Sequence, residues 1–444
     1  MRRPAIRTRK VICLMLVLAS AATATGCWDR RETNELAIAG AVALDRISEG
    51  KVLVSVEIIA NEAISGGTGA LAAPTKLVGW VIREEATTVP NALRNIQRRM
   101  PKLLFLGQVS TLVIGQNLAR EGLAGAVDYF GMNPEIRRSI YITTCDSGSG
   151  LLQRPFIYEL ASRTLLGLIM NSATTGKSVA VTLNEFLVKL SEPGIEPITL
   201  HTASRATHDL AIKRSGEDVK QTYAGQPVPE PLESEHEIEG ERSPESVVLD
   251  PLREQGTAEQ IKAVTFALGI AAYREDKMVG FLDGNDARGY LWAVNRVDQG
   301  ALEVPNPFSA AGDMTLDIAR AVSTMDVRIE GGKPAITFKV NVDLEGAFWP
   351  LDTPLHEPGA VQAIEAAAKT MIEAEMLRSL QIVREEFRTD IYGFGQAIYR
   401  KNPKLWHSMA EDWNDRGLQE LQINLEVRTR LRSPGGKFLR HRAG

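Results

Sequence analysis

The sequence predicts a multi-domain α+β protein with mixed or antiparallel sheets flanked by helices and a long helix in its C-terminal half. Its 444 residues are more than one ordinary hydrophobic core accommodates. Two alternating, β-branched segments, 322–329 and 335–344, flank a polar turn at 330–333, which indicates an antiparallel hairpin. Residues 358–389 then repeat apolar side chains every three or four positions, which is the period of a helix.

Strand and helix patterns alternate in the N-terminal half, which predicts an α/β-type domain over residues 27–203. Thr182 and Glu185 have the spacing of a capping box, in which two side chains satisfy free backbone N–H groups at the start of a helix. The predicted order is a strand at 52–59, a helix at 88–99, a strand at 109–114, a helix at 117–130 and a strand at 137–144.

The composition changes near residue 204. Residues 225–245 combine proline and glutamate with almost no large apolar side chains, so they bury too little surface to offset the entropy of ordering. We therefore expect 204–258 to be an acidic flexible linker or insertion. The remaining predicted parts are a C-terminal α+β domain at 259–435, with strands at 264–273, 278–282 and 421–431 and a short helix at 403–413, and a tail at 436–444.

The N-terminus determines the expected compartment. A basic segment, 1–10, precedes an apolar run, 11–22, which is shorter than the about 20 residues that cross a bilayer and is typical of a signal peptide. Small residues then lead to Gly26 and Cys27, a pattern that resembles the lipobox of bacterial lipoproteins. We expect 1–26 to be a lipoprotein signal peptide, cleaved between Gly26 and Cys27, and Cys27 to carry the lipid. An ordinary secretory signal with an incidental cysteine is the alternative.

The residues directly after the predicted lipid site are candidates for contact with a partner or with the membrane. Trp28 has an indole that favours both protein interfaces and the water–lipid boundary. Asp29, Arg30 and Arg31 beside it offer charges for partner loops or lipid headgroups. The alternative is that the segment serves only as a tether.

Charge argues against nucleic acid as a partner. The formal net charge is −4, and it becomes about −9 once the five basic side chains of residues 1–26 are removed. Phosphate backbones are bound by basic surfaces, which this balance does not supply. We therefore expect no nucleic-acid partner.

No catalytic arrangement, metal site or cofactor is predicted, and we expect a protein that is not an enzyme. The six histidines lack metal-ligand spacing. Cys145 follows an apolar run and is expected to be a small buried side chain. Charged residues outside any recognisable site are interpreted as solvated, and these are Glu235, His236 and Glu237 in the acidic segment and the pairs Glu84–Glu85 and Glu385–Glu386 on predicted helix surfaces.

Several motifs together resemble the Ger(x)C family of spore germination lipoproteins. The start of the mature chain, Cys27 to Glu32 (CWDRRE), and the turn at 390–395 (DIYGFG) are specific in combination. Further matches lie between them in the family's order, namely LAREG at 118–122, NPEIR at 133–137 and AYREDKMVG at 272–280. The resemblance covers about residues 27–205 and 261–435.

The resemblance implies a C subunit of a nutrient germinant receptor, with a multi-domain α+β fold and no enzymatic activity. It also implies association with two integral-membrane partners, the A and B subunits, at the outer face of the spore inner membrane. Two other classes stay open as alternatives. A solute-binding lipoprotein of a transporter should show two α/β lobes with parallel sheets, which the hairpin at 322–344 disfavours, and a cell-wall hydrolase should show a catalytic constellation.

Overall fold

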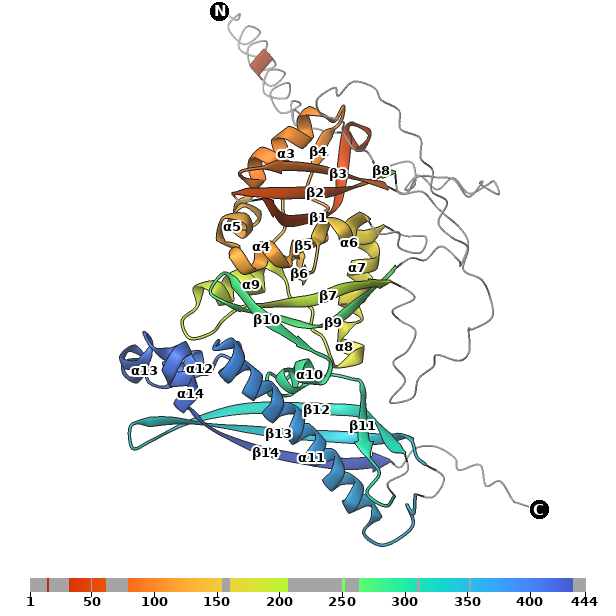
Figure 1. The fold of residues 1–444 in the computed structure, drawn as a ribbon, viewed down its shortest axis with the longest axis vertical. Coiled ribbons are helices and arrows are strands. Elements are labelled where there is room, and N and C mark those ends of the chain that lie inside the picture. Colours follow the sequence, from red (N-terminus) through yellow and green to blue (C-terminus); the bar gives the residue numbers. More distant parts are fainter. Residues whose placement is uncertain are drawn as a thin grey trace, which may run out of the picture.

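The computed structural model describes residues 14–15, 32–48, 50–60, 79–153, 160–206, 250–251, 263–309, 312–350 and 353–433. Apart from 14–15, the predicted signal peptide lies outside these residues, as do the predicted lipid site and the tail 436–444. Most of the predicted linker, including Glu235, His236 and Glu237, also lies outside them. The described chain forms two sheets that follow one another along the long axis of the molecule (Figure 1).

The first sheet combines a parallel centre with antiparallel flanks. Its described strands run in the order β10-β9-β7-β6-β5-β1-β2-β3-β8, and β4 pairs with the start of β1. Neighbours are parallel from β1 through β5 and β6 to β7, and antiparallel elsewhere on this path. The strands are β1 (Leu36–Ser48), β2 (Lys51–Ile59), β3 (Gly79–Ala86), β4 (Leu103–Phe105), β5 (Thr111–Gly115), β6 (Tyr141–Cys145), β7 (Ile198–Ala206), β8 (Asp250–Pro251), β9 (Ala263–Arg274) and β10 (Lys277–Asp283).

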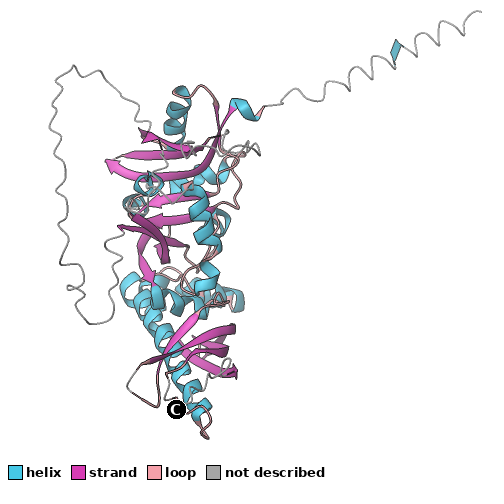
Figure 2. Ribbon diagram, turned by 90° about the vertical axis from the view of Figure 1, so that its right-hand side faces the viewer, coloured by secondary structure: helices cyan, strands magenta, loops and turns pink. Residues whose placement is uncertain are grey.

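Helices cover both faces of the centre of this sheet (Figures 1 and 2). On one face, α6 and α7 pack against Ala41, Ala43 and Val113. On the other, α3, α4 and α5 pack against the alternate side chains of the same strands, including Val42 and Leu112. The helices of this half are α3 (Val89–Arg98), α4 (Gln116–Glu121), α5 (Ala124–Met132), α6 (Gly148–Gln153), α7 (Ala161–Met170), α8 (Ser172–Thr175) and α9 (Leu183–Ser191), after a short 3₁₀ turn, η1 (Thr33–Glu35).

The single helix predicted at 117–130 is wrong in one respect, because the chain forms two helices there. Gly122 separates α4 from α5 with a φ of 132°, which is outside the range that other residues adopt readily. The backbone N–H of Leu123 donates to the carbonyl of Asp276 at 3.0 Å, and that of Ala124 donates to its carboxylate at 2.9 Å. These two hydrogen bonds therefore hold the segment between α4 and α5 against the β9–β10 turn.

The strands predicted at 264–273 and 278–282 are confirmed as β9 and β10, and both belong to the first sheet. β9 pairs antiparallel with β7, and β10 pairs with β9. The sheet therefore contains strands from both sides of the predicted linker at 204–258. From β10 the chain enters α10 (Gly284–Ala293), which leads to the second sheet.

The second sheet has the order β11-β12-β13-β14, and α11 lies across it (Figure 1). Its strands are β11 (Ala301–Pro305), β12 (Asp313–Glu330), β13 (Lys333–Phe348) and β14 (Gln422–Ser433). The predicted hairpin is confirmed, since β12 and β13 pair antiparallel up to Glu330 and Lys333. β14 returns beside β13 in the parallel direction, and its alternate side chains are exposed as the sequence pattern predicts.

The predicted long helix is confirmed as α11 (Ala360–Gln381), which continues into a π-helical turn, η4 (Ile382–Phe387). Arg388 ends it in the left-handed conformation, with a φ of 49°. The chain then forms α12 (Phe394–Lys401), α13 (Pro403–Met409), a second π turn, η5 (Trp413–Gly417), and α14 (Leu418–Glu420) before β14. The helix predicted at 403–413 therefore ends earlier than expected. The predicted fold class, multi-domain α+β with mixed sheets, is confirmed.

Candidate functional site

The residues predicted to meet the membrane or a partner lie just before the described chain. Gly26, Cys27 and the segment Trp28, Asp29, Arg30 and Arg31 are outside the described residues. The described chain resumes at Glu32 and enters β1 at Leu36, a strand that pairs with β2 and β5 in the interior of the first sheet. The predicted lipid site is thus joined to the core of the first sheet by few residues.

The DIYGFG turn at 390–395 is built around one buried carboxylate. Asp390 has no exposed surface. It accepts hydrogen bonds from the backbone N–H groups of Gly393 at 2.8 Å, Phe394 at 3.1 Å and Gly395 at 2.7 Å, and from the indole of Trp413 at 2.9 Å. Asp390 therefore satisfies the free N–H groups at the start of α12. The turn therefore both follows the end of η4 and begins the next helix.

Burial dominates the ionisation of this carboxylate. It raises the pKa of Asp390 from 3.8 to about 6, and the hydrogen bonds from Gly395 and Trp413 oppose that rise only in part. Asp390 has no exposed surface and its oxygens hold the start of α12 and Trp413, so its carboxylate is part of the fold.

The same turn joins the two sheets. The N–H of Glu196, just before β7, donates to the carbonyl of Asp390 at 2.9 Å, and the hydroxyl of Thr389 donates to the carbonyl of Tyr273 in β9 at 2.6 Å. Gly194 and Gly395 pass so closely that a Cβ on either would collide with the other's backbone. The segment before β7 and the turn before α12 therefore form one packed junction between the halves.

A cavity of about 230 Å³ opens at this junction. Its walls come from both halves of the chain, with α9 and the start of β7 on one side and α10 with the DIYGFG turn on the other. The lining is mainly aliphatic and aromatic, and it consists of Val179, Val181, Glu185, Lys189, Ile195, Ile198, Tyr290, Val294, Arg296, Ile391 and Tyr392. We call it the junction cavity.

Three charged side chains line the junction cavity, and two of them neutralise each other. Arg296 donates to Glu185 at 2.9 Å, and Glu185 also completes the predicted capping box with Thr182, which is confirmed. Burial opposes ionisation of Glu185, but the hydrogen bonds from Thr182 and Arg296 outweigh it and lower its pKa. Lys189 has no hydrogen bond or ion pair with any residue that the structure describes. Burial, followed by repulsion from Arg296, lowers the pKa of Lys189 to about 8.

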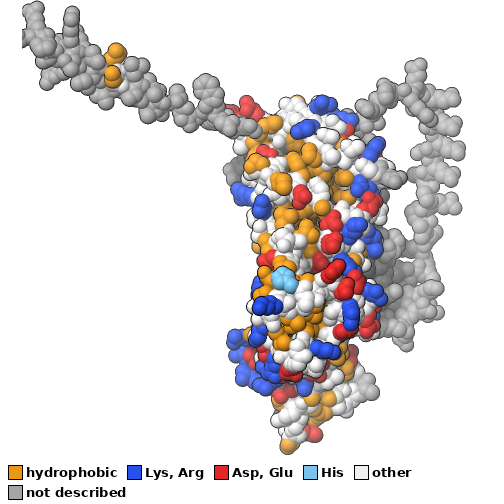
Figure 3. Space-filling view, turned by 90° about the vertical axis from the view of Figure 1, so that its left-hand side faces the viewer, with side chains coloured by type: hydrophobic (Ala, Val, Ile, Leu, Met, Phe, Trp, Pro, Cys, Tyr) orange, Lys and Arg blue, Asp and Glu red, His pale blue; other side chains and the backbone are white. Residues whose placement is uncertain are grey.

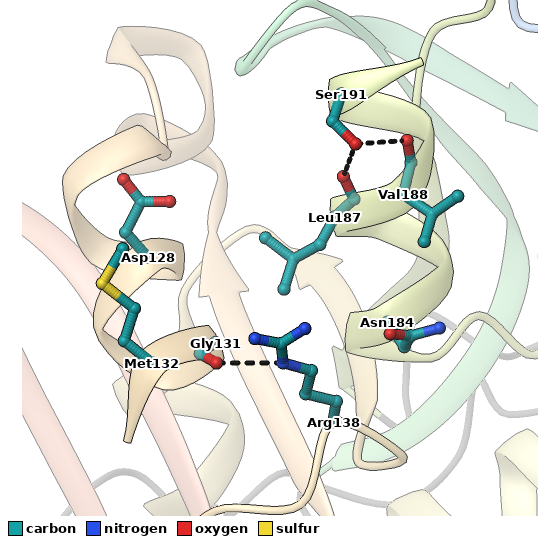
Figure 4. Close-up of a pocket in the computed structure, with 8 residues that line it drawn as sticks. All are labelled: Asp128, Gly131, Met132, Arg138, Asn184, Leu187, Val188 and Ser191. Carbon is teal, nitrogen blue, oxygen red and sulfur yellow. Dashed lines mark hydrogen bonds between the residues drawn. The ribbon is translucent and has the colours of Figure 1, made fainter. Parts of the chain in front are cut away.

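A second hollow, of about 240 Å³, lies on the surface between α5 and α9 (Figure 4). Met132, whose exposed fraction is 79%, and Val188, at 41%, contribute apolar surface to it. Arg138 lies between the two helices and donates to the carbonyl of Gly131 at 3.0 Å, while Asp128 stands at the α5 side. Exposed apolar side chains beside single charges are typical of surfaces that contact other proteins. We call this hollow the α5–α9 groove.

Hydrophobic side chains remain visible along the side of the molecule on which α5, α9 and α13 lie (Figure 3). Acidic and basic side chains are interspersed with them, and Lys and Arg gather on the lower part of this side. The exposed basic residues of α12 and α13 include Arg400, Lys401 and Lys404. This face of the described part of the molecule is therefore mixed in character.

Other ionisable residues noted in the sequence lie in strands, form ion pairs or are buried in the fold. Glu84 and Glu85 lie in β3, so their prediction as a helix surface is wrong, and Glu84 pairs with Arg99 at 2.7 Å. Cys145 is buried, as expected. Within the described ranges no three histidine, cysteine, aspartate or glutamate side chains gather as they would around a metal ion. None of the described helices is long and apolar enough to cross a bilayer.

The sequence pattern did not reveal the junction cavity. Glu185 was predicted only as part of a capping box, and no motif includes Lys189. Tyr290 and Arg296 belong to a region for which no helix was predicted. These residues meet only because β9 and β10 join the first sheet and place α10 beside α9. The DIYGFG motif was the one signal in the sequence that pointed to this region.

Comparison with known proteins gives one family for both halves. The sequence model "Spore germination protein N-terminal domain" matches residues 29–201, and "Spore germination B3/GerAC like, C-terminal" matches residues 268–435. Spore germination protein KC of Bacillus subtilis strain 168 is 24% identical over 438 residues, which is 96% of each chain. Spore germination protein B3 of the same strain is 19% identical over 404 residues, covering 88% of this chain and 89% of that protein.

Among solved structures, the crystal structure of the GerBC protein aligns with a TM-score of 0.45 and 13% identity, over 88% of this chain and 96% of that chain. The two family models together span both sheets and the junction between them, in the order in which the sequence motifs occur. The chain therefore belongs to the GerAC-like family of spore germination proteins, the Ger(x)C family that its motifs resemble.

Proposed function

We propose that this protein is a non-enzymatic C subunit of a spore nutrient germinant receptor, held on the outer face of the spore inner membrane by a lipid on Cys27. The observation that supports this best is the extent of the family match, which includes residues 29–201 and 268–435. The likeness to spore germination protein KC over 96% of both chains indicates that the whole chain is organised like that of a germination protein.

The anchor follows from the N-terminal sequence. Cys27 stands directly after an apolar run and a series of small residues, where a lipoprotein receives its diacylglyceryl group. Several acyl chains on one residue anchor a protein stably, whereas a single chain gives only marginal binding. Eight residues, 28–35, separate Cys27 from β1, and a fully extended chain of that length spans at most about 30 Å. The anchor would therefore hold the first sheet close to the membrane surface.

Contact with partners, and not catalysis, is the proposed mode of action. The buried Asp390 at the junction uses its oxygens to hold α12 and Trp413. The α5–α9 groove offers exposed apolar surface with single charges, which suits protein contact. The integral-membrane A and B subunits are the proposed partners, with Trp28, Asp29, Arg30 and Arg31 as a docking segment next to the membrane. The antiparallel pairs β11–β12 and β12–β13 of the second sheet disfavour the solute-binding alternative, whose lobes would both hold parallel sheets.

Deletion of the gene, followed by germination assays on a panel of nutrients, tests the proposal. We expect the deleted spores to lose their response to one nutrient or nutrient set while they still germinate through a route that bypasses receptors. Reintroduction of the wild-type gene should restore the response, and Cys27→Ala should restore less of it because the protein is no longer lipidated. An unchanged response to every nutrient that wild-type spores recognise would contradict the proposal. Hydrolytic turnover by the purified chain, abolished by one point mutation, would contradict the non-enzymatic assignment.

A further inference from the structure

The junction cavity contains a lysine that forms no direct ion pair with any residue that the structure describes. Arg296 is paired with Glu185, so Lys189 is the lining cation without a counter-ion among the described residues. A cationic side chain removed from water is unfavourable unless an anion pairs with it. Glu185, Asp390 and Glu192 attract Lys189 without direct contact, but burial and repulsion from Arg296 outweigh them, so an anion in direct contact would stabilise its charged form.

The other side chains that line the cavity indicate the chemistry of the rest of the ligand. Ile195 and Ile198 line one side of the cavity, Val294 and Ile391 line the other, and no second unpaired cation lines it among the described residues. A dianion such as phosphate would bring one more negative charge than Lys189 neutralises, and it would place polar oxygens against aliphatic side chains. A singly charged carboxylate with a short branched hydrocarbon part matches both the charge and the walls, and the volume of about 230 Å³ admits it.

We propose that the junction cavity binds a small aliphatic carboxylate, whose carboxylate group pairs with Lys189 while its hydrocarbon part contacts Ile195, Ile198 and Val294. The ligand would lie between α9 and α10 and would touch the DIYGFG turn through Ile391. Because these elements belong to different halves of the chain, binding would stabilise the junction. This inference does not depend on the proposed role in germination.

Titration of the full-length lipidated protein in detergent with 3-methylbutanoate tests the proposal, and calorimetry gives the dissociation constant. The neutral isostere 3-methylbutanamide is the matched probe. We expect the carboxylate to bind at least about 10-fold more tightly than the amide, because the amide forms no ion pair with Lys189. Absence of carboxylate binding up to about 10 mM, or equal affinity for both probes, would overturn the proposal.

Lys189→Met separates the ion pair from the apolar contacts, because methionine keeps most of the length of lysine and removes its charge. We expect this variant to lose at least about 10-fold in affinity for 3-methylbutanoate. Its unfolding midpoint should not fall, since an unpaired, half-buried charge is removed. Lys404→Met, an exposed position on α13, is the control and should bind as the wild type does. Wild-type affinity in a folded Lys189→Met variant would overturn the proposal.

The pH dependence of the wild-type protein tests the same contact without any substitution. Lys189 has a pKa of about 8, so affinity for the carboxylate should fall as the pH rises through and above that value. The other charged groups that act on Lys189 are Arg296, Glu185, Asp390 and Glu192. The pKa of Asp390 is about 6 and that of Glu185 is lowered, so neither changes its charge in this range. Affinity that stays constant from pH 7 to about pH 10 would overturn the proposal.

Discussion

At the scale of single residues, the buried carboxylate of Asp390 makes stability depend on pH. Its pKa is about 6 in the folded protein, above the ordinary value of 3.8, because burial disfavours the charged form. Between these two values the folded protein binds a proton on Asp390 more readily than the unfolded chain does. The contribution of this residue to the free energy of unfolding therefore decreases as the pH rises from about 4 to 6, and it is constant below and above that window.

Asp390→Asn removes this titration and tests its sign. The stability of the wild type relative to the variant should decrease by up to about 3 kcal/mol as the pH rises from 4 to 6, which corresponds to the difference between the two pKa values. Urea unfolding of both proteins at several pH values measures the difference. Asp412→Asn, an exposed change close in the sequence, is the control and should follow the wild type. Parallel curves for the wild type and Asp390→Asn would show that Asp390 does not titrate in this window.

At the scale of secondary-structure elements, a buried ion pair joins α10 to α11. Arg288 donates to both carboxylate oxygens of Glu375, and the indole of Trp292 donates to the same carboxylate at 3.0 Å. Arg288 and Glu375 are both buried. Removal of one member of such a pair leaves the other charged and unpaired inside the protein, which is the costly outcome.

Glu375→Ala should therefore destabilise the protein by about 3–5 kcal/mol in urea unfolding, because Arg288 and Trp292 lose their common acceptor. Glu373→Ala, on the same helix, is the matched control, since Glu373 forms a partly exposed pair with Lys369 at 3.7 Å. That change should cost less than about 1 kcal/mol. Equal effects of the two substitutions would mean that the buried pair contributes no more than the surface pair.

Elements with a clear period were predictable from the sequence, and elements with two buried faces were not. The hairpin around 330–333 and α11 were predicted correctly because one face of each is exposed to solvent and the other is buried. β1 (Leu36–Ser48) was missed, since it is buried on both faces and its alanines and glycine give no alternation. The break between α4 and α5 at Gly122 depends on Asp276, a residue far away in the sequence, so no local sequence pattern predicted it.

The same reasoning explains how much of the candidate site could be predicted. The motif at 390–395 was found because its residues are contiguous. Its donor Trp413 comes from beyond α13, and its contact with Gly194 comes from the other half of the chain. Lys189 and Tyr290 both line the junction cavity, although the whole predicted linker separates them in the sequence. Only the topology of the first sheet brings them together.

At the scale of the whole molecule, the proposed anchor gives the two sheets different positions relative to the membrane. β1 follows closely after Cys27 and lies in the first sheet, while the second sheet occupies the opposite end of the long axis (Figure 1). An anchored molecule would therefore present the first sheet, with the α5–α9 groove, nearer to the membrane.

Replacement of residues 28–32 by a Gly/Ser segment of equal length tests the docking role of Trp28 to Arg31. The length of the tether and the position of Cys27 stay unchanged, so lipidation and the amount of protein in the membrane should not change. We expect a weaker germination response, because the indole and the adjacent charges no longer contact the membrane or the partner loops. A normal response with normal lipidation would show that this segment is only a tether.

Association with membrane subunits is the central claim, and one measurement tests it most directly. Spore inner membranes are solubilised in a mild detergent, the protein is captured through an affinity tag at its C-terminus, and the accompanying proteins are identified by mass spectrometry. We predict that the integral-membrane A and B subunits of one receptor are recovered together with the lipidated wild-type protein, and that Cys27→Ala recovers less of both. Recovery of correctly lipidated protein without either subunit would contradict the account.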